Sequence, residues 1–121
     1  MLNRKINANI NKTETLIGAN TEFKGLLTSE AGIRIDGAVT GDIQCKGDVT
    51  IGNRGFAVSN IVARNITIGG TVHGDVNSNH KLTINAKGKL IGDHSSNSIH
   101  IERGGVIVGK RVIRNSLQEN S

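Results

Sequence analysis

The sequence predicts an all-β protein, a parallel β-helix of about six coils with about 17 residues in each coil. Three observations predict this fold. An apolar-x-apolar pattern recurs six times along the 121 residues, a glycine follows it in most copies, and the apolar residues are mainly Ile, Val and Leu. The chain has 16 Gly, two Phe and no Trp, Tyr or Pro. This composition is typical of short strands joined by tight turns.

The second apolar residue of each pair defines an inward column. Alternation of apolar and polar residues is the periodicity of a strand, and the repeat is too short and too rich in Gly and Asn for a pair of helices. If the coils stack as parallel strands about 4.8 Å apart, this column becomes one continuous core ladder. Its members lie 16 to 18 residues apart and are Ile17, Ile35, Ile51, Ile68, Ile84 and Ile101.

A glycine column follows the apolar pairs, as in Phe23-Gly25-Leu27 and Val39-Gly41-Ile43. We expect it to mark a bend where a side chain would clash or where the backbone needs a positive φ. Ser59 takes the place of this glycine in the third copy. His94 and Arg111 stand where the fifth and sixth copies should have an apolar residue. We therefore expect coils three, five and six to be less regular.

From residue 15 to about residue 111 the chain resembles the bactofilins. The resemblance lies in residues 23–27, 32–43, 49–52 and 66–74, and the string Ile-Arg-Ile-Asp-Gly at 33–37 is its most specific part. It implies a right-handed helix, a handedness that the columns alone do not fix. It also implies nucleotide-independent filaments without polarity. The implied role is a cytoskeletal scaffold that organises cell shape, wall-modifying enzymes or appendages, with no cofactor and no enzymatic activity.

The expected domain organisation is one β-helix domain at residues 15–113, between a disordered tail at 1–14 and a short polar tail at 114–121. Met1 and Leu2 are apolar, and Arg4 and Lys5 follow them. These four residues predict a weak anchor on anionic membrane lipid; a plain disordered leader is the alternative. There is no signal peptide pattern and no apolar run near the ~20 residues of a membrane span. We expect a cytoplasmic protein at the inner face of the cell membrane.

Neither tail has the pattern of a cap, and bare strand edges pair with other chains. The main predicted partner is therefore a second copy of the chain, bound end to end. The residues expected to be exposed at the first coil are Ile17, Phe23 and Leu27, and those at the last coil are Ile99, Ile101 and Ile107.

An outward apolar stripe is predicted at Val58, Ile91 and Val108, with His73 between Val58 and Ile91. Alternation places these residues on the outside of the coils. We expect a lateral contact or the docking of unidentified client proteins there, because exposed apolar stripes often mark contact surfaces. Chance exposure is the alternative.

Other function classes were weighed against this interpretation. The net charge of +5 comes from scattered basic residues and the chain has only two aromatic rings, so no nucleic-acid partner is predicted. Asp42, Asp75 and Asp93 could stack into a ladder that binds a divalent cation. The preferred interpretation is that these carboxylates are simply exposed to solvent, and no metal is predicted. Two alternatives stay open: a left-handed hexapeptide-repeat acyltransferase, and a monomeric β-helical adaptor.

The acyltransferase alternative would need a general base. The candidates are His73, His80, His94 and His100, none of which has a recognisable orienting group or substrate loop in the sequence. We therefore predict no catalytic residue. The lone Cys45 excludes an intramolecular disulfide and is expected to be a small buried residue.

Overall fold

The computed structural model describes residues 12–113, and within this range it consists of strands and turns without a helix. All strand pairs are parallel. The strands are β1 (Thr13–Ile17), β2 (Glu22–Lys24), β3 (Leu27–Ser29), β4 (Gly32–Ile35), β5 (Ala38–Thr40), β6 (Ile43–Cys45), β7 (Asp48–Ile51), β8 (Phe56–Val58), β9 (Ile61–Ile68), β10 (Thr71–His73), β11 (Val76–Ile84), β12 (Lys89–Ile91), β13 (His94–Ser95), β14 (Ser98–Ile101) and β15 (Val106–Val108).

The strands form a solenoid with three faces. Face 1 holds β1, β4, β7, the later halves of β9 and β11, and β14. Face 2 holds β2, β5, β8, β10, β12 and β15. Face 3 holds β3, β6, the earlier halves of β9 and β11, and β13. Because β9 and β11 run around the corner from face 3 to face 1, these two faces form one sheet of nine strands. Strand β1 begins at Thr13, two residues before the start predicted for the domain.

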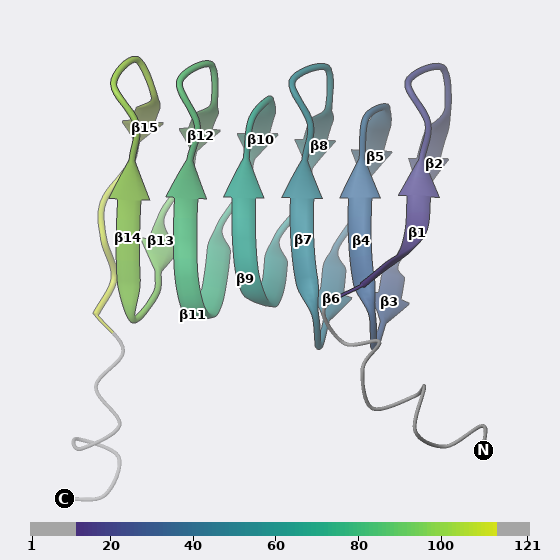
Figure 1. Ribbon diagram of the computed structural model, residues 1–121, viewed down its shortest axis with the longest axis horizontal. Coiled ribbons are helices and arrows are strands. Elements are labelled where there is room, and N and C mark those ends of the chain that lie inside the picture. The colour runs from purple at the N-terminus through teal and green to yellow at the C-terminus, as the bar shows by residue number, and fades with distance from the viewer. Residues whose placement is uncertain (1–11, 114–121) are drawn as a thin grey trace, which may run out of the picture.

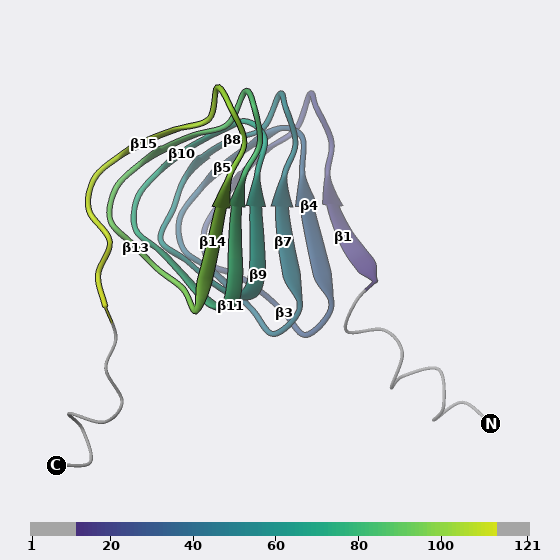
Figure 2. The ribbon, with the colours of Figure 1, turned by 60° about the vertical axis from the view of Figure 1, so that its left-hand side comes forward.

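The solenoid is right-handed and has six coils, since six strands stack on face 2. In Figure 1 the strands of face 1 lie toward the viewer and run upward, the chain returns downward behind them, and the coils advance from right to left. Figure 2 shows the same stack of flattened coils from the side. The predicted fold is confirmed, and the left-handed hexapeptide alternative is wrong.

The core is a set of stacked aliphatic rows. Ile17, Ile35, Ile51, Ile68, Ile84 and Ile101 are partners in register, as the repeat predicted. A second row on the same face contains Ile33, Val49, Ile66 and Leu82, all fully buried. Burial of each such side chain contributes about 1.5–3 kcal/mol as an upper estimate. The narrow interior explains why aliphatic side chains predominate over aromatic ones.

The glycine column meets both predicted requirements. Gly41, Gly74, Gly92 and Gly109 have φ of 126°, 144°, 151° and 152°. A Cβ at any of them would also overlap the backbone carbonyl of the residue one coil earlier. Ser59, in the third coil, does not have a positive φ. It is buried, and its hydroxyl has no hydrogen-bond partner. The third coil is therefore irregular at this corner, as expected.

Candidate self-association surfaces

Both ends of the solenoid present unpaired strand edges within residues 12–113. At the N-terminal end, β1, β2 and β3 each pair with one strand only, β4, β5 and β6. At the C-terminal end, β14 pairs only with β11, and β15 only with β12. An isolated parallel β-bridge pairs His94 of β13 with Arg111, so one backbone pairing extends beyond β13. Each end thus exposes the backbone groups that would hydrogen-bond to a further coil.

The N-terminal end exposes Phe23 and Leu27, but not Ile17. Phe23 and Leu27 are half-buried and pack against the core cluster, as predicted. Ile17 is only 9% exposed and belongs to the core itself, so its predicted exposure is wrong. It points into the first coil, where Ile35 lies beside it in register and Phe23 and Leu27 border the same core. Leu26, which the prediction missed, is 62% exposed at the neighbouring corner.

The C-terminal end is more open than the N-terminal end. Ile101 is 46% exposed, although its five counterparts in the same row are buried. Ile99 and Ile107 are half-buried against the core. All three residues lie at this end of the solenoid. The prediction missed Ile113, which is 77% exposed just after the last coil.

His94 belongs to a row that has one residue from each coil. This row is aliphatic apart from His94 and its last residue, Arg111. His94 pairs with Val76 on one side and with Arg111 on the other. His94 is 7% exposed, and its Nδ1 has no hydrogen-bond partner. Burial lowers the pKa of His94, the positive charge of Arg111 lowers it further, and the carboxylate of Asp93 acts in the opposite direction. These effects together favour the neutral form of the His94 ring.

The aspartates after the glycine column form the predicted ladder with Asn60. The Oδ1 atoms of Asn60 and Asp75 accept hydrogen bonds from the backbone N–H groups of Asp75 and Asp93, both at 3.0 Å. Asp93 Oδ1 accepts from the N–H of Lys110 at 3.1 Å, and Asp42 Oδ1 from the N–H of Asn60 at 3.4 Å. Each side chain thus links one coil to the next. No cluster of three or more potential metal-ligating side chains occurs within residues 12–113.

The stripe predicted on the outside of the coils is a single row on face 2. Val58 pairs with His73, His73 with Ile91, and Ile91 with Val108. Val58 is 43% and Val108 55% exposed, while His73 and Ile91 are half-buried. The prediction missed the parallel row two residues earlier, which contains Phe56 at 43% exposure and Val106 at 44%. The same strand alternation would have identified that row, since residues two apart point to one side.

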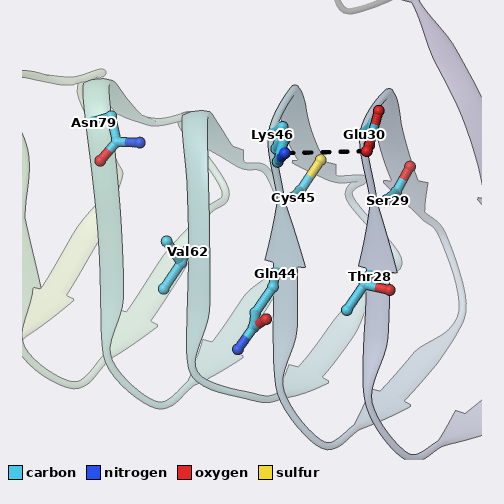
Figure 3. A pocket seen from close by; sticks show the side chains of 8 residues that line it. All are labelled: Thr28, Ser29, Glu30, Gln44, Cys45, Lys46, Val62 and Asn79. Carbon is cyan, nitrogen blue, oxygen red and sulfur yellow. Dashed lines mark ion pairs between the residues drawn. The ribbon is translucent and has the colours of Figure 1, made fainter.

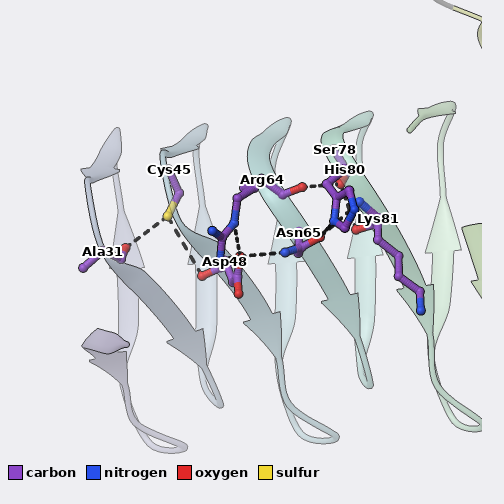
Figure 4. Close-up of polar contacts among 8 residues, drawn as sticks. All are labelled: Ala31, Cys45, Asp48, Arg64, Asn65, Ser78, His80 and Lys81. Atoms are coloured by element: carbon purple, nitrogen blue, oxygen red, sulfur yellow. Dashed lines mark hydrogen bonds and ion pairs between the residues drawn. The ribbon is translucent and has the colours of Figure 1, made fainter. Parts of the chain in front are cut away.

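The corner between faces 3 and 1 is polar. Asp48 Oδ1 accepts hydrogen bonds from Arg64 Nε at 3.0 Å and from Asn65 Nδ2 at 3.0 Å. Asn65 Oδ1 accepts from the backbone N–H of Lys81 at 3.1 Å and lies 2.9 Å from His80 Nδ1. Figure 4 shows these groups side by side across successive coils. His80 therefore lies in a structural network at the turn.

A shallow hollow of about 680 Å³ lies on face 3 near Cys45. Figure 3 shows its lining, with Lys46 and Glu30 paired at 4.0 Å above it. The Cys45 thiol is 7% exposed and donates a hydrogen bond to the carbonyl of Ala31 at 3.1 Å. Burial raises the pKa of this thiol, which keeps it protonated. Cys45 is therefore a small buried residue beside the hollow.

The residues predicted to bind the membrane, Met1, Leu2, Arg4 and Lys5, lie outside the described residues, as do residues 114–121. Among residues 12–113, no helix is long and apolar enough to cross a membrane.

The fold places the chain among parallel β-solenoids, with strand edges that have no partner at either end within residues 12–113. A family model described as bactofilin, polymer-forming cytoskeletal, matches residues 15–112. The chain therefore belongs to the bactofilin family of polymer-forming cytoskeletal proteins.

Two relatives are similar to the chain over most of its length. Bactofilin BacP of Myxococcus xanthus strain DK1622 is 22% identical over 107 residues, which are 88% of this chain and 45% of that protein. The chain thus spans less than half the length of this curated relative. A cryo-EM reconstruction of Thermus thermophilus bactofilin double helical filaments matches with a TM-score of 0.79 and 26% identity, over 84% of this chain and 100% of that one.

Proposed function

We propose that this chain polymerises end to end into nucleotide-independent filaments that serve as a cytoskeletal scaffold. The observation that carries the proposal is the pair of uncapped ends. Strand edges at β1 and β2, and at β14 and β15, lack a partner on one side within the described chain. Apolar core side chains are partly exposed beside these edges.

The energetics favour contact between ends. Phe23, Leu27, Ile101 and Ile107 are each partly exposed, and covering each one contributes roughly 1 kcal/mol or more. Backbone pairing along two or three strands adds to this and fixes the geometry. These gains oppose the entropic cost of association. No nucleotide hydrolysis is needed to drive such a contact.

We propose that the filaments lack polarity, so that like ends meet. The resemblance to bactofilins implies this arrangement, and the corner row on face 3 supports it. Head-to-tail stacking in register would place Ile101 next to Ile17 of the following copy, which suits the core. It would also place Arg111 against Leu27 and press a guanidinium group onto an apolar residue. Burial of an unpaired charge is costly.

Electron microscopy of the full chain in buffer without nucleotide tests the proposal. Long filaments are expected. A stable monomer at all concentrations would contradict polymerisation and favour an adaptor. A discrete trimer with transferase activity toward an acyl donor would contradict both the scaffold and the prediction that the chain is not an enzyme.

A membrane-associated scaffold is the second part of the proposal. Partial insertion of Met1 and Leu2 would contribute about 2–4 kcal/mol, and Arg4 and Lys5 about 1 kcal/mol each near anionic lipid. One tail would bind weakly, but a filament presents many tails together. Deletion of residues 1–5 should abolish co-sedimentation of filaments with anionic liposomes. Unchanged co-sedimentation would contradict the anchor.

The assembly also extends sideways in this proposal. The double helical filaments of the Thermus thermophilus relative support pairing of two filaments of this chain. We expect client proteins to bind the remaining exposed surface of such filaments at the inner face of the membrane.

A further inference from the structure

We propose that face 2 is the surface through which two filaments of this chain pair, with a second copy of face 2 as its occupant. This inference rests on the proposed polymerisation and identifies the residues that join the filaments. The contact surface consists of the outward side chains of β8, β10, β12 and β15.

Exposed apolar side chains concentrate on this surface. Phe56, Val58, Val106 and Val108 are 43–55% exposed, and half-buried Ile91 lies between the two pairs. The rings of Phe56 and His73 are in contact across neighbouring strands, with centroids 5.5 Å apart. Outward apolar side chains therefore occur on β8, β12 and β15, and Phe56 contacts His73 of the intervening strand β10.

Charge is sparse on this strip of four strands. Its eight outward positions include only two ionisable side chains, those of His73 and Lys89. The eight are Phe56, Val58, Thr71, His73, Lys89, Ile91, Val106 and Val108. On the first strand of the face, Glu22 and Lys24 pair with each other at 3.9 Å. Two such strips can therefore approach each other without burying many unpaired charges.

The outward rows of the other two faces are more polar. On face 1 the row begins with Leu16, which is 62% exposed, and continues with Arg34, three threonines and His100. On face 3 the exposed Val62 stands in a row with Thr28, Gln44, Asn77 and Ser95, and Val112, also 42% exposed, lines a second hollow together with Val62. Single exposed apolar residues set among polar ones are ordinary, whereas exposed apolar residues gathered on several strands of one face indicate a contact surface.

The occupant follows from the geometry of a filament. Each chain of six coils adds about 29 Å to a filament, so with like ends joined a pair of oppositely directed strips recurs roughly every 58 Å. A second filament of this chain carries the same strips at the same interval, so every copy can be matched at once. Each contact is small, but many contacts in series give a stable pair. Flat sheets with apolar outer rows pack face to face in this way.

Two valines provide a matched test. Val58 on face 2 is 43% exposed and Val62 on face 3 is 42% exposed, and they lie four residues apart in the same chain segment. We compare Val58→Glu, Val62→Glu and the wild type by filament width in negative-stain electron microscopy. Differential sedimentation then separates paired from single filaments.

The wild type and Val62→Glu should form paired filaments. Val58→Glu should form single filaments of normal length, with the paired fraction lowered roughly tenfold or more. Phe56→Glu, a second variant on the strip, should behave in the same way.

Three results would overturn the assignment. The first is that both face 2 variants still form paired filaments. The second is that Val62→Glu loses pairing as much as the face 2 variants do. The third is that the wild type forms only single filaments at every concentration. Loss of all filaments or of the strand circular dichroism spectrum in both face 2 variants would also overturn it, because a surface used only for pairing is needed for neither. Failure of the end-to-end proposal would differ from these results, since the wild type would then form no filaments at all.

Discussion

Gly92 lies against the backbone carbonyl of Gly74, one coil earlier, so closely that a Cβ on Gly92 would overlap this oxygen. The φ of Gly92 is 151°, which L side chains rarely adopt. Gly109 lies against Gly92, and Gly74 against Ser59, in the same way. The absence of a side chain at these three glycines therefore lets the coils approach to the spacing of a parallel sheet.

Replacement of Gly92 by alanine should lower the free energy of unfolding by about 2–4 kcal/mol, from backbone strain and the forced separation of two coils. Gly18→Ala is the matched control, because a Cβ there would meet its nearest atom, Thr21 Oγ1, at 3.7 Å and φ is not positive. It should change stability by less than about 1 kcal/mol. Thermal unfolding at equal protein concentration measures both. Equal midpoints for the two variants would contradict the role of the glycine column.

His94 should make the solenoid less stable in mild acid. Its pKa is lower in the folded chain than in the unfolded chain, so below about pH 6.5 the unfolded chain binds a proton that the folded chain does not. Stability should fall as the pH decreases from that point to the folded pKa, and then level off. Circular dichroism melting at several pH values between 8 and 5, in steps of about one unit, measures the effect.

His94→Val should remove much of this pH dependence and raise stability, because valine suits the row that contains Ile61 and Val76. His100→Gln, at an exposed position on face 1, should retain the wild-type pH dependence. If His94→Val melts with the same pH dependence as the wild type, another group is responsible.

Asp75 should stabilise the coil stack as a hydrogen-bond acceptor rather than as a charge. Asp75→Ala leaves the N–H of Asp93 without its partner and should cost about 1 kcal/mol. Asp75→Asn should retain most of the stability, because Asn60 already accepts the same bond in this ladder. Chemical denaturation measures both variants. A large loss in Asp75→Asn would show that the charge itself matters, for example through a bound cation.

Cys45 should react slowly with thiol reagents in the folded chain. Burial raises its pKa, and its hydrogen bond to Ala31 holds the thiol in place. A Thr28→Cys change in a Cys45→Ala background places a thiol at an exposed position on the same face. This variant should react at least roughly tenfold faster with an aromatic disulfide reagent near pH 8. Equal rates would mean that the coils open readily at Cys45.

Most of the fold could be predicted from the spacing of a few residues. Ile35, Ile51, Ile68 and Ile84 recur at the coil period, and the register pairs them as expected. The stripe on face 2 followed from the same alternation. A period cannot give handedness, since both hands repeat in the same way; the right hand came from the resemblance.

Side-chain exposure at the ends could not be predicted from the period. Ile17 and Ile101 are the first and last members of one row, yet one is 9% and the other 46% exposed. The difference depends on local packing at each end, where Phe23 and Leu27 lie against the core at one end and Ile99 and Ile107 at the other. The continuation of β9 and β11 around a corner also depends on local backbone geometry rather than on the repeat.

The mass of single-end variants tests the central claim most directly. Phe23→Arg places a charge at the N-terminal end, and Ile107→Arg places one at the C-terminal end. Val62→Arg, on the side of the solenoid, is the control and should form filaments like the wild type. Each variant is measured by light scattering coupled to size-exclusion chromatography, alone and in mixtures.

If like ends join, each end variant retains one working contact and should form a dimer that does not grow when the two variants are mixed. Monomers that pair only on mixing would show head-to-tail contacts and contradict filaments without polarity. Long filaments from both end variants would contradict end-to-end polymerisation itself.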